Sequence, residues 1–291
     1  MPRSRPSTIL AGGIQLVSVT GDPPANVAKI TRLGRELKSA HPQLALLVAP
    51  ELAVTGYSAG ERFHALAEPW PHGDSLRALA ALARELEVVL VTGYAEASST
   101  PGLIYDSAAV FERNGQPIAS CRKSHCLDGE RRYFTDGDDL RRISTSLGQL
   151  GVMVCWDAAF PEVARTYALA GADLLVTIGA WEDPHVRDWD LVAAARAYDN
   201  VTPHVAVNRT GPDGDVSFSG HSRIVDCLGE TVAELGSDED GLLVGAVDLE
   251  ATQKVRAGYG SQLRDRRPEL YAAVSAPATA SIGPPASSES K

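Results

Sequence analysis

The sequence predicts an α/β fold in which buried strands are combined with amphipathic helices. Short apolar runs recur between helical patterns along the chain. Several of these runs, such as 88–91 and 174–176, are apolar on both faces, as expected of interior strands covered by helices. The strands predicted over 221–226 and 242–248 have no helix between them, so the fold is not a simple alternation of strand and helix.

Local patterns place the individual elements. A helix over 25–39 is indicated by apolar residues spaced three and four apart, and a helix over 74–87 has Asp74 as its expected N-cap. Two more helices are predicted over 160–170 and 187–200. Strands are predicted near 9–17, 45–50, 88–94, 107–113, 149–154, 173–178, 203–208, 221–226 and 242–248. Gly115, Gly214 and Gly229 mark hairpin-like turns.

Composition excludes several classes of function. The chain has 291 residues, a size that suits one α/β domain, and its net charge of −10 argues against a nucleic-acid partner. It lacks the run of roughly 18–20 apolar residues that a membrane helix needs, and its N-terminus lacks the pattern of a signal peptide. Four cysteines in an acidic chain favour reduced thiols and a cytoplasmic location. No cofactor is expected.

Cys155 is the first candidate for chemistry. It follows the apolar run 151–154 and precedes a helical pattern that begins near Pro161. A strand that delivers a cysteine to a turn before a helix presents the thiol at the sheet edge, where helix N-terminal N–H groups favour a thiolate and an oxyanion. The alternative is a small buried core cysteine.

Glu51 and Lys123 also stand at the ends of strand-like runs. Pro50 ends the buried run 45–49 directly before Glu51, which places that carboxylate in a partly desolvated position suited to a general base. Lys123 follows the short strand-like stretch 118–122. Taken alone, Glu51 has the alternative of an ordinary solvated loop glutamate, and Lys123 has the alternative of a surface lysine.

In this order, the segments resemble the carbon–nitrogen hydrolase (nitrilase) superfamily, whose catalytic set is Glu, Lys and Cys. The resemblance covers about residues 9–271. The matching positions, in chain order, are Gly21-Asp22, Asn26, Pro50-Glu51-Leu52, Thr55-Gly56-Tyr57, Arg122-Lys123, His125, Glu130, Phe134, Gly137, Cys155-Trp156-Asp157, Phe160-Pro161-Glu162, 171–175, Trp181, Arg196-Ala197, Asn200, Asn208-Arg209, Phe218, Gly220, Ser222 and 267–271. The departures are Cys121 for an aromatic residue, Cys126 for leucine, Asp106 for a common asparagine, and the variant segment 198–200.

The resemblance implies a four-layer αββα sandwich of two mixed β-sheets flanked by helices. Residues 1–8 are expected to form a flexible N-terminus, and the Ala, Ser, Pro and Gly residues of 272–291 predict a low-complexity, poorly packed tail. The resemblance also implies one carbon–nitrogen hydrolase domain over 9–271. It implies an amidase mechanism: Cys155 attacks a small amide to form a thioester, and Glu51 moves the protons. Lys123 and the backbone N–H of Trp156 hold the oxyanion.

Four further residues are expected to bind or support the substrate. Glu130 stands where the family has a glutamate that positions the substrate or orients the lysine; the alternative is an ion pair with Arg131 or Arg132. Tyr57 and Trp181 are expected in the pocket wall, and the alternative for both is the core. Trp156 completes this set.

Other activities remain open at this point. The segment from Cys155 to Glu162 is closer to amidase and carbamoylase branches than to nitrilases, so the alternatives are an N-carbamoyl amine or amino acid amidohydrolase, then a nitrilase, then a non-catalytic member. A cysteine–histidine enzyme that uses His125 would leave Glu51 and Lys123 without a role. No metal site is expected, because Cys121, His125 and Cys126 lack a second matched pair of ligands.

A homodimer or a larger homo-oligomer is expected. The helix over 161–170 has small and apolar residues, among them Tyr167, around much of its circumference. In the resembled family this region and the helix near 187–200 build a two-fold dimer. The alternative is that these residues pack within the chain.

Overall fold

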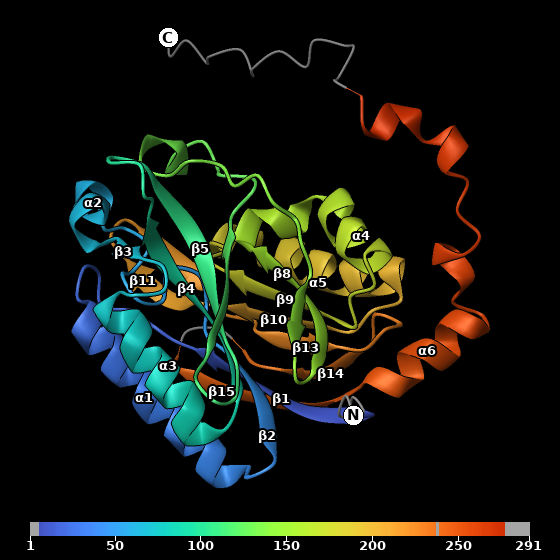
Figure 1. Cartoon of the computed structure of the whole chain (residues 1–291), viewed down its shortest axis with the longest axis horizontal. Coiled ribbons are helices and arrows are strands. Elements are labelled where there is room, and N and C mark those ends of the chain that lie inside the picture. Colours follow the sequence, from blue (N-terminus) through green and yellow to red (C-terminus); the bar gives the residue numbers. More distant parts are fainter. Residues whose placement is uncertain (1–5, 237–238, 277–291) are drawn as a thin grey trace.

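The computed structural model describes residues 6–236 and 239–276. Two mixed sheets face one another, with helices on the outer side of each (Figure 1). The predicted four-layer αββα sandwich is therefore confirmed. Of the predicted terminal segments, 1–8 and 272–291, most residues lie outside the described residues. Of the rest, Thr8 begins the first strand, and Ala272–Val274 form a short 3-10 helix, η7.

The first sheet has seven described strands. Its central strands β1, β2 and β4 are parallel, whereas β15, β5 and β6 join antiparallel and β3 is a short parallel addition beside β4. In spatial order the strands are β15 (Gly241–Asp248), β1 (Thr8–Gln15), β2 (Leu44–Val48), β4 (Val89–Ala97), β5 (Ile104–Phe111) and β6 (Pro117–Arg122), with β3 (Glu68–Pro69) beside β4.

The second sheet has six described strands and the same mixed character. Strands β8, β9 and β10 are parallel, and the outer strands pair antiparallel. In spatial order they are β14 (Thr231–Glu234), β13 (Arg223–Val225), β10 (His204–Asn208), β9 (Leu174–Gly179), β8 (Gly148–Val154) and β7 (Ile143–Thr145). A separate hairpin, β11 (Thr210–Asp213) and β12 (Val216–Ser219), turns at Gly214 as predicted.

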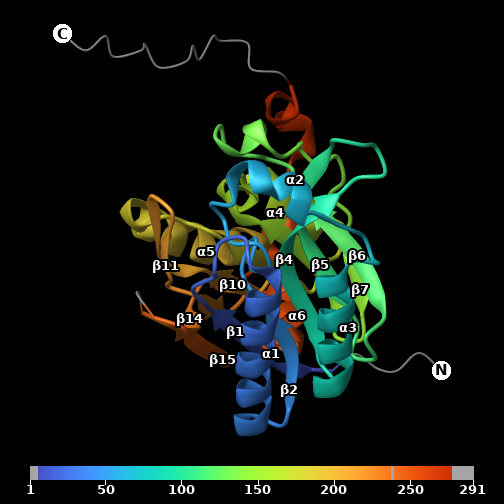
Figure 2. The same ribbon diagram turned by 90° about the vertical axis from the view of Figure 1, so that its left-hand side faces the viewer.

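The helices divide between the two outer faces. Helices α1 (Pro23–Ala40) and α3 (Asp74–Leu86) cover the first sheet, and α4 (Pro161–Leu169) and α5 (Val186–Asn200) cover the second (Figure 2). Asp22 caps α1, where its carboxylate accepts the Ala25 N–H at 3.0 Å. Asp74 is not the predicted N-cap: the cap position is Gly73, and Asp74 is the first helical residue.

The remaining helices are short or lie apart from the sandwich. They are α2 (Phe63–Leu66), α6 (Leu249–Ala257) and the 3-10 helices η1 (Gly60–Arg62), η2 (Glu130–Arg132), η3 (Cys155–Ala159), η4 (Asp183–His185), η5 (Ser261–Leu263) and η6 (Pro268–Leu270). From α6 onward the chain runs along one side of the sandwich (Figure 1). Within the described residues, no helix combines the length and the apolar character that a membrane span requires.

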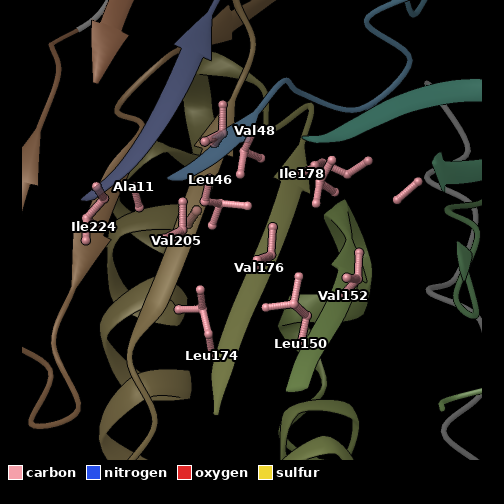
Figure 3. Close-up of a cluster of buried hydrophobic side chains, with 14 of the residues drawn as sticks. Ala11, Leu46, Val48, Leu150, Val152, Leu174, Val176, Ile178, Val205 and Ile224 are labelled. Carbon is pink, nitrogen blue, oxygen red and sulfur yellow. The ribbon is translucent and has the colours of Figure 1, made fainter. Parts of the chain in front are cut away.

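The main core fills the space between the two sheets. In β2, Leu46 and Val48 point into this space, whereas Leu47 points to the layer of α1 and α3. Both faces of the strand are buried, which explains its continuous apolar run. Figure 3 shows Leu46 and Val48 opposite Val152 and Val176 of the second sheet.

This architecture brings three strand ends together. Strand β6 runs in the same direction as β2, because two antiparallel pairings separate it from β4, which is parallel to β2. Glu51 therefore follows β2 and Lys123 follows β6 at the same edge of the first sheet. Cys155 follows β8 in the facing sheet.

Candidate active site

Lys123 lies at the centre of a buried cluster of carboxyl groups. Its ammonium nitrogen Nζ is 2.7 Å from Glu51 Oε1, 2.7 Å from Glu130 Oε2 and 3.7 Å from Asp106 Oδ2. The Lys123 side chain is fully buried, so the alternative of a surface lysine is wrong. Burial disfavours the ammonium, but the charge of Glu51, followed by that of Cys155, Glu130 and Asp106, raises the pKa of Lys123 well above its ordinary value. Lys123 is thus a fixed positive charge.

The cluster has the shape of a small cation site, and the lysine occupies it. Carboxylate oxygens of Glu51, Asp106 and Glu130 lie within 4.8 Å of one another. The Lys123 ammonium stands between them, at hydrogen-bonding distance from Glu51 and Glu130. The positive charge that these acids hold is therefore the side chain of Lys123.

Cys155 sits in a sharp turn at the end of β8. Its backbone has φ of +47°, a conformation that a residue other than glycine rarely adopts. The turn continues into η3, a 3-10 helix, and Ala180 lines the same cavity as Cys155. The strand–turn–helix arrangement predicted from the sequence is confirmed, with a 3-10 helix between the cysteine and α4.

The resting state of Cys155 differs from the expectation that the turn favours a thiolate. Burial, and then the negative charge of Glu51, raise the pKa of the Cys155 thiol well above its ordinary value. The charge of Lys123 and the Ala180 N–H act in the opposite direction but do not outweigh them. The sulfur therefore keeps its proton at neutral pH, and a base must remove that proton as the sulfur reacts.

Tyr57 and Glu130 are bonded to each other and to the cluster. The Tyr57 hydroxyl donates to Glu130 Oε1 at 2.7 Å, and the Leu127 backbone N–H donates to Glu130 Oε2 at 2.8 Å. Burial, and then the charge of Glu130, raise the pKa of Tyr57, so its hydroxyl stays protonated as a donor. The alternative of an ion pair to Arg131 is wrong, because the Arg131 guanidinium pairs with Asp136 instead.

A cavity of about 490 Å³ opens beside Cys155. Tyr57, Glu130, Trp156 and Trp181 all line it, so the structure brings these four predicted residues to one place. The Trp156 and Trp181 rings lie 5.6 Å apart. Trp181 is also packed into the core, so it is both a residue of the pocket wall and a core residue. The other lining residues are Leu127, Ala159, Ala180, Glu182, His185, Asp188, Leu191 and Val192.

Asp157 is a structural residue of the site that sequence reasoning did not single out. Its carboxylate accepts the backbone N–H of Val154 at 3.2 Å, of Ser124 at 3.1 Å and of His125 at 3.0 Å. It thereby ties the Cys155 turn to the segment that carries Lys123. The sequence did carry a signal for this role. An acid at the third position of a helix often accepts the backbone N–H of the residue that precedes the helix.

His125 supports this connection rather than the thiol. Its ring nitrogen Nδ1 is 2.8 Å from Asp157 Oδ1, and its ring stacks on Phe160 with 3.9 Å between centroids. These contacts hold His125 beside the turn.

Comparison with known proteins identifies the family of the chain. A model of the carbon–nitrogen hydrolase family matches residues 10–257. A probable nitrilase from Schizosaccharomyces pombe is 38% identical over 265 residues, which cover 91% of this chain and 97% of that protein. An N-carbamoylputrescine amidase from Solanum lycopersicum is 34% identical over 276 residues, covering 87% and 90%.

Solved structures give the same result. The crystal structure of a carbon–nitrogen hydrolase from Helicobacter pylori G27 superposes with a TM-score of 0.86 at 33% identity, covering 92% of this chain and 98% of that one. The family model spans most of the chain, and the relatives align over almost their full length. The protein therefore belongs to the carbon–nitrogen hydrolase (nitrilase) superfamily and is a hydrolase of carbon–nitrogen bonds other than peptide bonds.

Proposed function

We propose that the protein hydrolyses a small amide through a thioester on Cys155. The observation that carries this proposal is that Cys155 shares one cavity with Glu130, whose carboxylate is bonded to the Lys123–Glu51 ion pair. A nucleophile, a buried base and a buried cation are the groups that acyl transfer needs.

The first half of the reaction forms the thioester. Glu51 accepts the Cys155 proton while the sulfur bonds to the amide carbon, and the carbonyl electrons move onto oxygen. The Lys123 ammonium and the Trp156 backbone N–H stabilise that oxyanion; one such donor in a dry site is typically worth ~3–4 kcal/mol. As the oxyanion collapses, Glu51 gives its proton to the departing nitrogen, and ammonia or an amine leaves.

The second half uses water. Glu51 takes a proton from a water molecule, whose oxygen attacks the thioester carbon. The Cys155 sulfur then leaves and recovers the proton, and the carboxylic acid is released. A thiol that is protonated at rest fits this cycle, because Glu51 removes the proton only as the sulfur attacks the carbonyl carbon of a substrate.

The cavity favours a small substrate with an apolar part. Its volume is about 490 Å³, and the apolar side chains of Trp156, Trp181 and Leu191 are among those that line it. An N-carbamoyl amine is the second candidate, which the similarity to an N-carbamoylputrescine amidase supports. Its hydrolysis by the same steps would release carbon dioxide together with ammonia and an amine. A nitrile is the third candidate, and a non-catalytic role the last.

Ammonia release from small amides, ureido compounds and nitriles, measured side by side, separates these candidates. We expect release from amides, and carbon dioxide in addition only if ureido compounds react. Cys155→Ala is the control for contaminating activity. No ammonia from any compound, with a folded wild-type protein, would overturn the proposal.

We also propose that the protein acts in the cytoplasm. All four cysteines, Cys121, Cys126, Cys155 and Cys227, are free thiols, and such thiols persist in a reducing compartment. Fractionation of the native cell, with detection of the protein by antibody, tests this. Recovery in an oxidising compartment would contradict it.

A further inference from the structure

Asp106 is a third acid beside the Glu51–Lys123 pair. It lies in β5, and its backbone carbonyl accepts the backbone N–H of Lys123 at 2.8 Å. This bond joins the backbone of β5 to that of Lys123, the residue after β6. The Asp106 side chain is fully buried. Carboxyl oxygens of Asp106 and Glu51 lie within 4.8 Å of each other, and a hydrogen bond between the two groups favours the protonated form of Asp106.

The hydrogen bonds around these acids are incomplete as long as all are ionised. Among the described residues, no donor reaches Glu51 Oε2 or either carboxyl oxygen of Asp106. A buried carboxylate oxygen without a donor is costly, because water has been removed and nothing replaces it. Three ionised acids, Glu51, Asp106 and Glu130, would also leave two negative charges unbalanced around the single ammonium of Lys123.

One proton placed between Asp106 and Glu51 reduces both problems. It supplies a donor, gives two of the oxygens a partner, and lowers the buried negative charge by one. The remaining question is which acid carries it.

The contacts of the three acids differ. Glu51 has the Lys123 ammonium at 2.7 Å, and Glu130 has that ammonium as well as the donors Tyr57 and Leu127. Asp106 stands 3.7 Å from the ammonium, beyond a hydrogen bond. Burial, and then the charge of Glu51, raise the pKa of Asp106 well above its ordinary value.

We propose that Asp106 is held as a neutral carboxylic acid and donates its hydroxyl to Glu51 Oε2, as a positioning residue for the base of the proposed amide hydrolysis. Lys123 holds one oxygen of Glu51, and Asp106 holds the other. The Glu51 carboxylate is thereby fixed in rotation while it keeps its negative charge and a free lone pair for the Cys155 proton.

An ionised Asp106 would have the opposite effect. It would repel Glu51 and compete with it for the Lys123 ammonium. The ionisable groups that face Asp106 are Glu51 after β2, Lys123 after β6, Glu130 in η2 and the thiol of Cys126. Lys123 alone among them is positive, so the surroundings favour the neutral form of Asp106.

Infrared spectroscopy of the wild-type protein tests the proton directly. A protonated carboxylic acid has a carbonyl stretch that a carboxylate lacks. We expect this band at neutral pH, and we expect it to shift when aspartate is labelled with carbon-13 at its side-chain carboxyl. The absence of the band, or a band that the aspartate label leaves in place, would overturn the proposal. This measurement does not require a variant to fold or a substrate to be known.

Two variants of similar size test the positioning. Asp106→Asn keeps a neutral donor, whereas Asp106→Leu removes it. With a small neutral amide as substrate, we expect kcat of the asparagine variant to exceed that of the leucine variant by about tenfold or more. The KM values should differ little, because Asp106 does not line the cavity. The infrared band should be absent from both variants. Equal kcat values in two folded variants would overturn the positioning role.

The two experiments separate this inference from the proposed function. If the protein hydrolysed none of the compounds tested, the kinetic comparison would be lost and the proposed function with it. The infrared band would still report whether Asp106 carries a proton.

Discussion

The Tyr57 hydroxyl donates to Glu130 Oε1 at 2.7 Å, and the same oxygen receives the Lys123 ammonium at 2.8 Å. This bond joins the loop after β2 to η2. Along the chain, the strands β3, β4, β5 and β6 lie between these two segments. The bond also holds Glu130 in the orientation that lets both of its oxygens contact Lys123. Tyr57 therefore acts on the buried ion pairs through Glu130, as well as forming part of the cavity wall.

Tyr57→Phe should lower kcat by about ten- to hundredfold, the usual effect of removing one hydrogen bond to a charged group. The ring and its edge-on contact with Phe218, at 5.3 Å between centroids, are retained. Tyr167→Phe is the matched control, because it removes a buried hydroxyl that donates to the Val152 carbonyl away from the cavity. We expect the control to reduce stability but not turnover per folded molecule. Equal turnover in both variants would contradict the role of Tyr57.

Cys155→Ala should abolish hydrolysis and leave the fold intact, since alanine is smaller and the turn is otherwise unchanged. Cys155→Ser should be nearly inactive, because a hydroxyl is a much weaker nucleophile. Mass spectrometry with a slow amide should find the acyl adduct on Cys155. Cys121, Cys126 and Cys227 serve as internal controls, because none of the three lines the cavity that opens beside Cys155. Turnover above about a tenth of wild type in the alanine variant would rule out the thiol mechanism.

Lys123→Met should lower turnover by a factor on the order of 100 or more. The substitution preserves much of the length but removes the cation, and it leaves Glu51 and Glu130 buried without a positive partner. Combined with Glu51→Gln, the loss should be little greater than that of the poorer single variant, because the two groups act as a unit. Steady-state kinetics of both single variants and the double variant test this. Additive losses would contradict a shared role.

Stability should fall as the pH decreases between about 6.5 and 4 because of His204. Its Nδ1 is 3.0 Å from the Ala193 carbonyl and its Nε2 is 2.7 Å from Thr177 Oγ1. Burial lowers the pKa of this fully enclosed ring from 6.5 to about 4. The unfolded chain thus binds a proton near 6.5, whereas the folded chain does not until about 4. The neutral His204 therefore contributes its full stabilisation of the folded state above about pH 6.5. This contribution is lost as the pH falls, and the loss levels off below about pH 4.

The size of this effect follows from about 1.4 kcal/mol per pKa unit, or roughly 2 kcal/mol between pH 6.5 and 5. Urea unfolding at about pH 7 and about pH 5 should show this extra loss in wild type but not in His204→Asn. The asparagine variant should be less stable at both pH values. The quantity to compare is therefore the change in unfolding free energy between the two pH values, in wild type and in the variant. The same loss in both proteins would contradict the assignment to His204.

The protein should form at least a homodimer. Tyr167 is one of the apolar residues of the 161–170 helix on which this expectation rests, but it is buried within the chain, where its hydroxyl donates to the Val152 carbonyl. Other apolar side chains of α4 and α5 are exposed instead: Leu169 at 49%, Leu191 at 65% and Tyr198 at 44%. A stable pair should bury more than ~1,000 Å² in total. Sedimentation at micromolar concentration tests this, and a single species near 30.8 kDa would refute the dimer.

Local sequence determined the main elements and the strand ends that precede Glu51, Lys123 and Cys155. The run Leu44–Val48 is apolar at every position because both faces of β2 are covered, and Pro50 ends it just before Glu51. Gly151–Val154 leads to Cys155 in the same way. The sequence pattern missed β7, because three residues at a sheet edge have no distinct period of their own. It also missed the helix α6, in which only Leu249 and Thr252 are buried, so that no apolar stripe marks it.

Only the tertiary structure decided the partners of each polar side chain. Glu130 could have paired with the adjacent Arg131, yet it binds Lys123 and Tyr57, and Asp106 lies against Glu51 from a different strand. These contacts join residues far apart in the chain. A sequence pattern records whether a position is buried, because burial is set by neighbours at the period of the helix or strand. It does not record which buried acid meets which donor, because that depends on how the strands are ordered and on how far each side chain reaches.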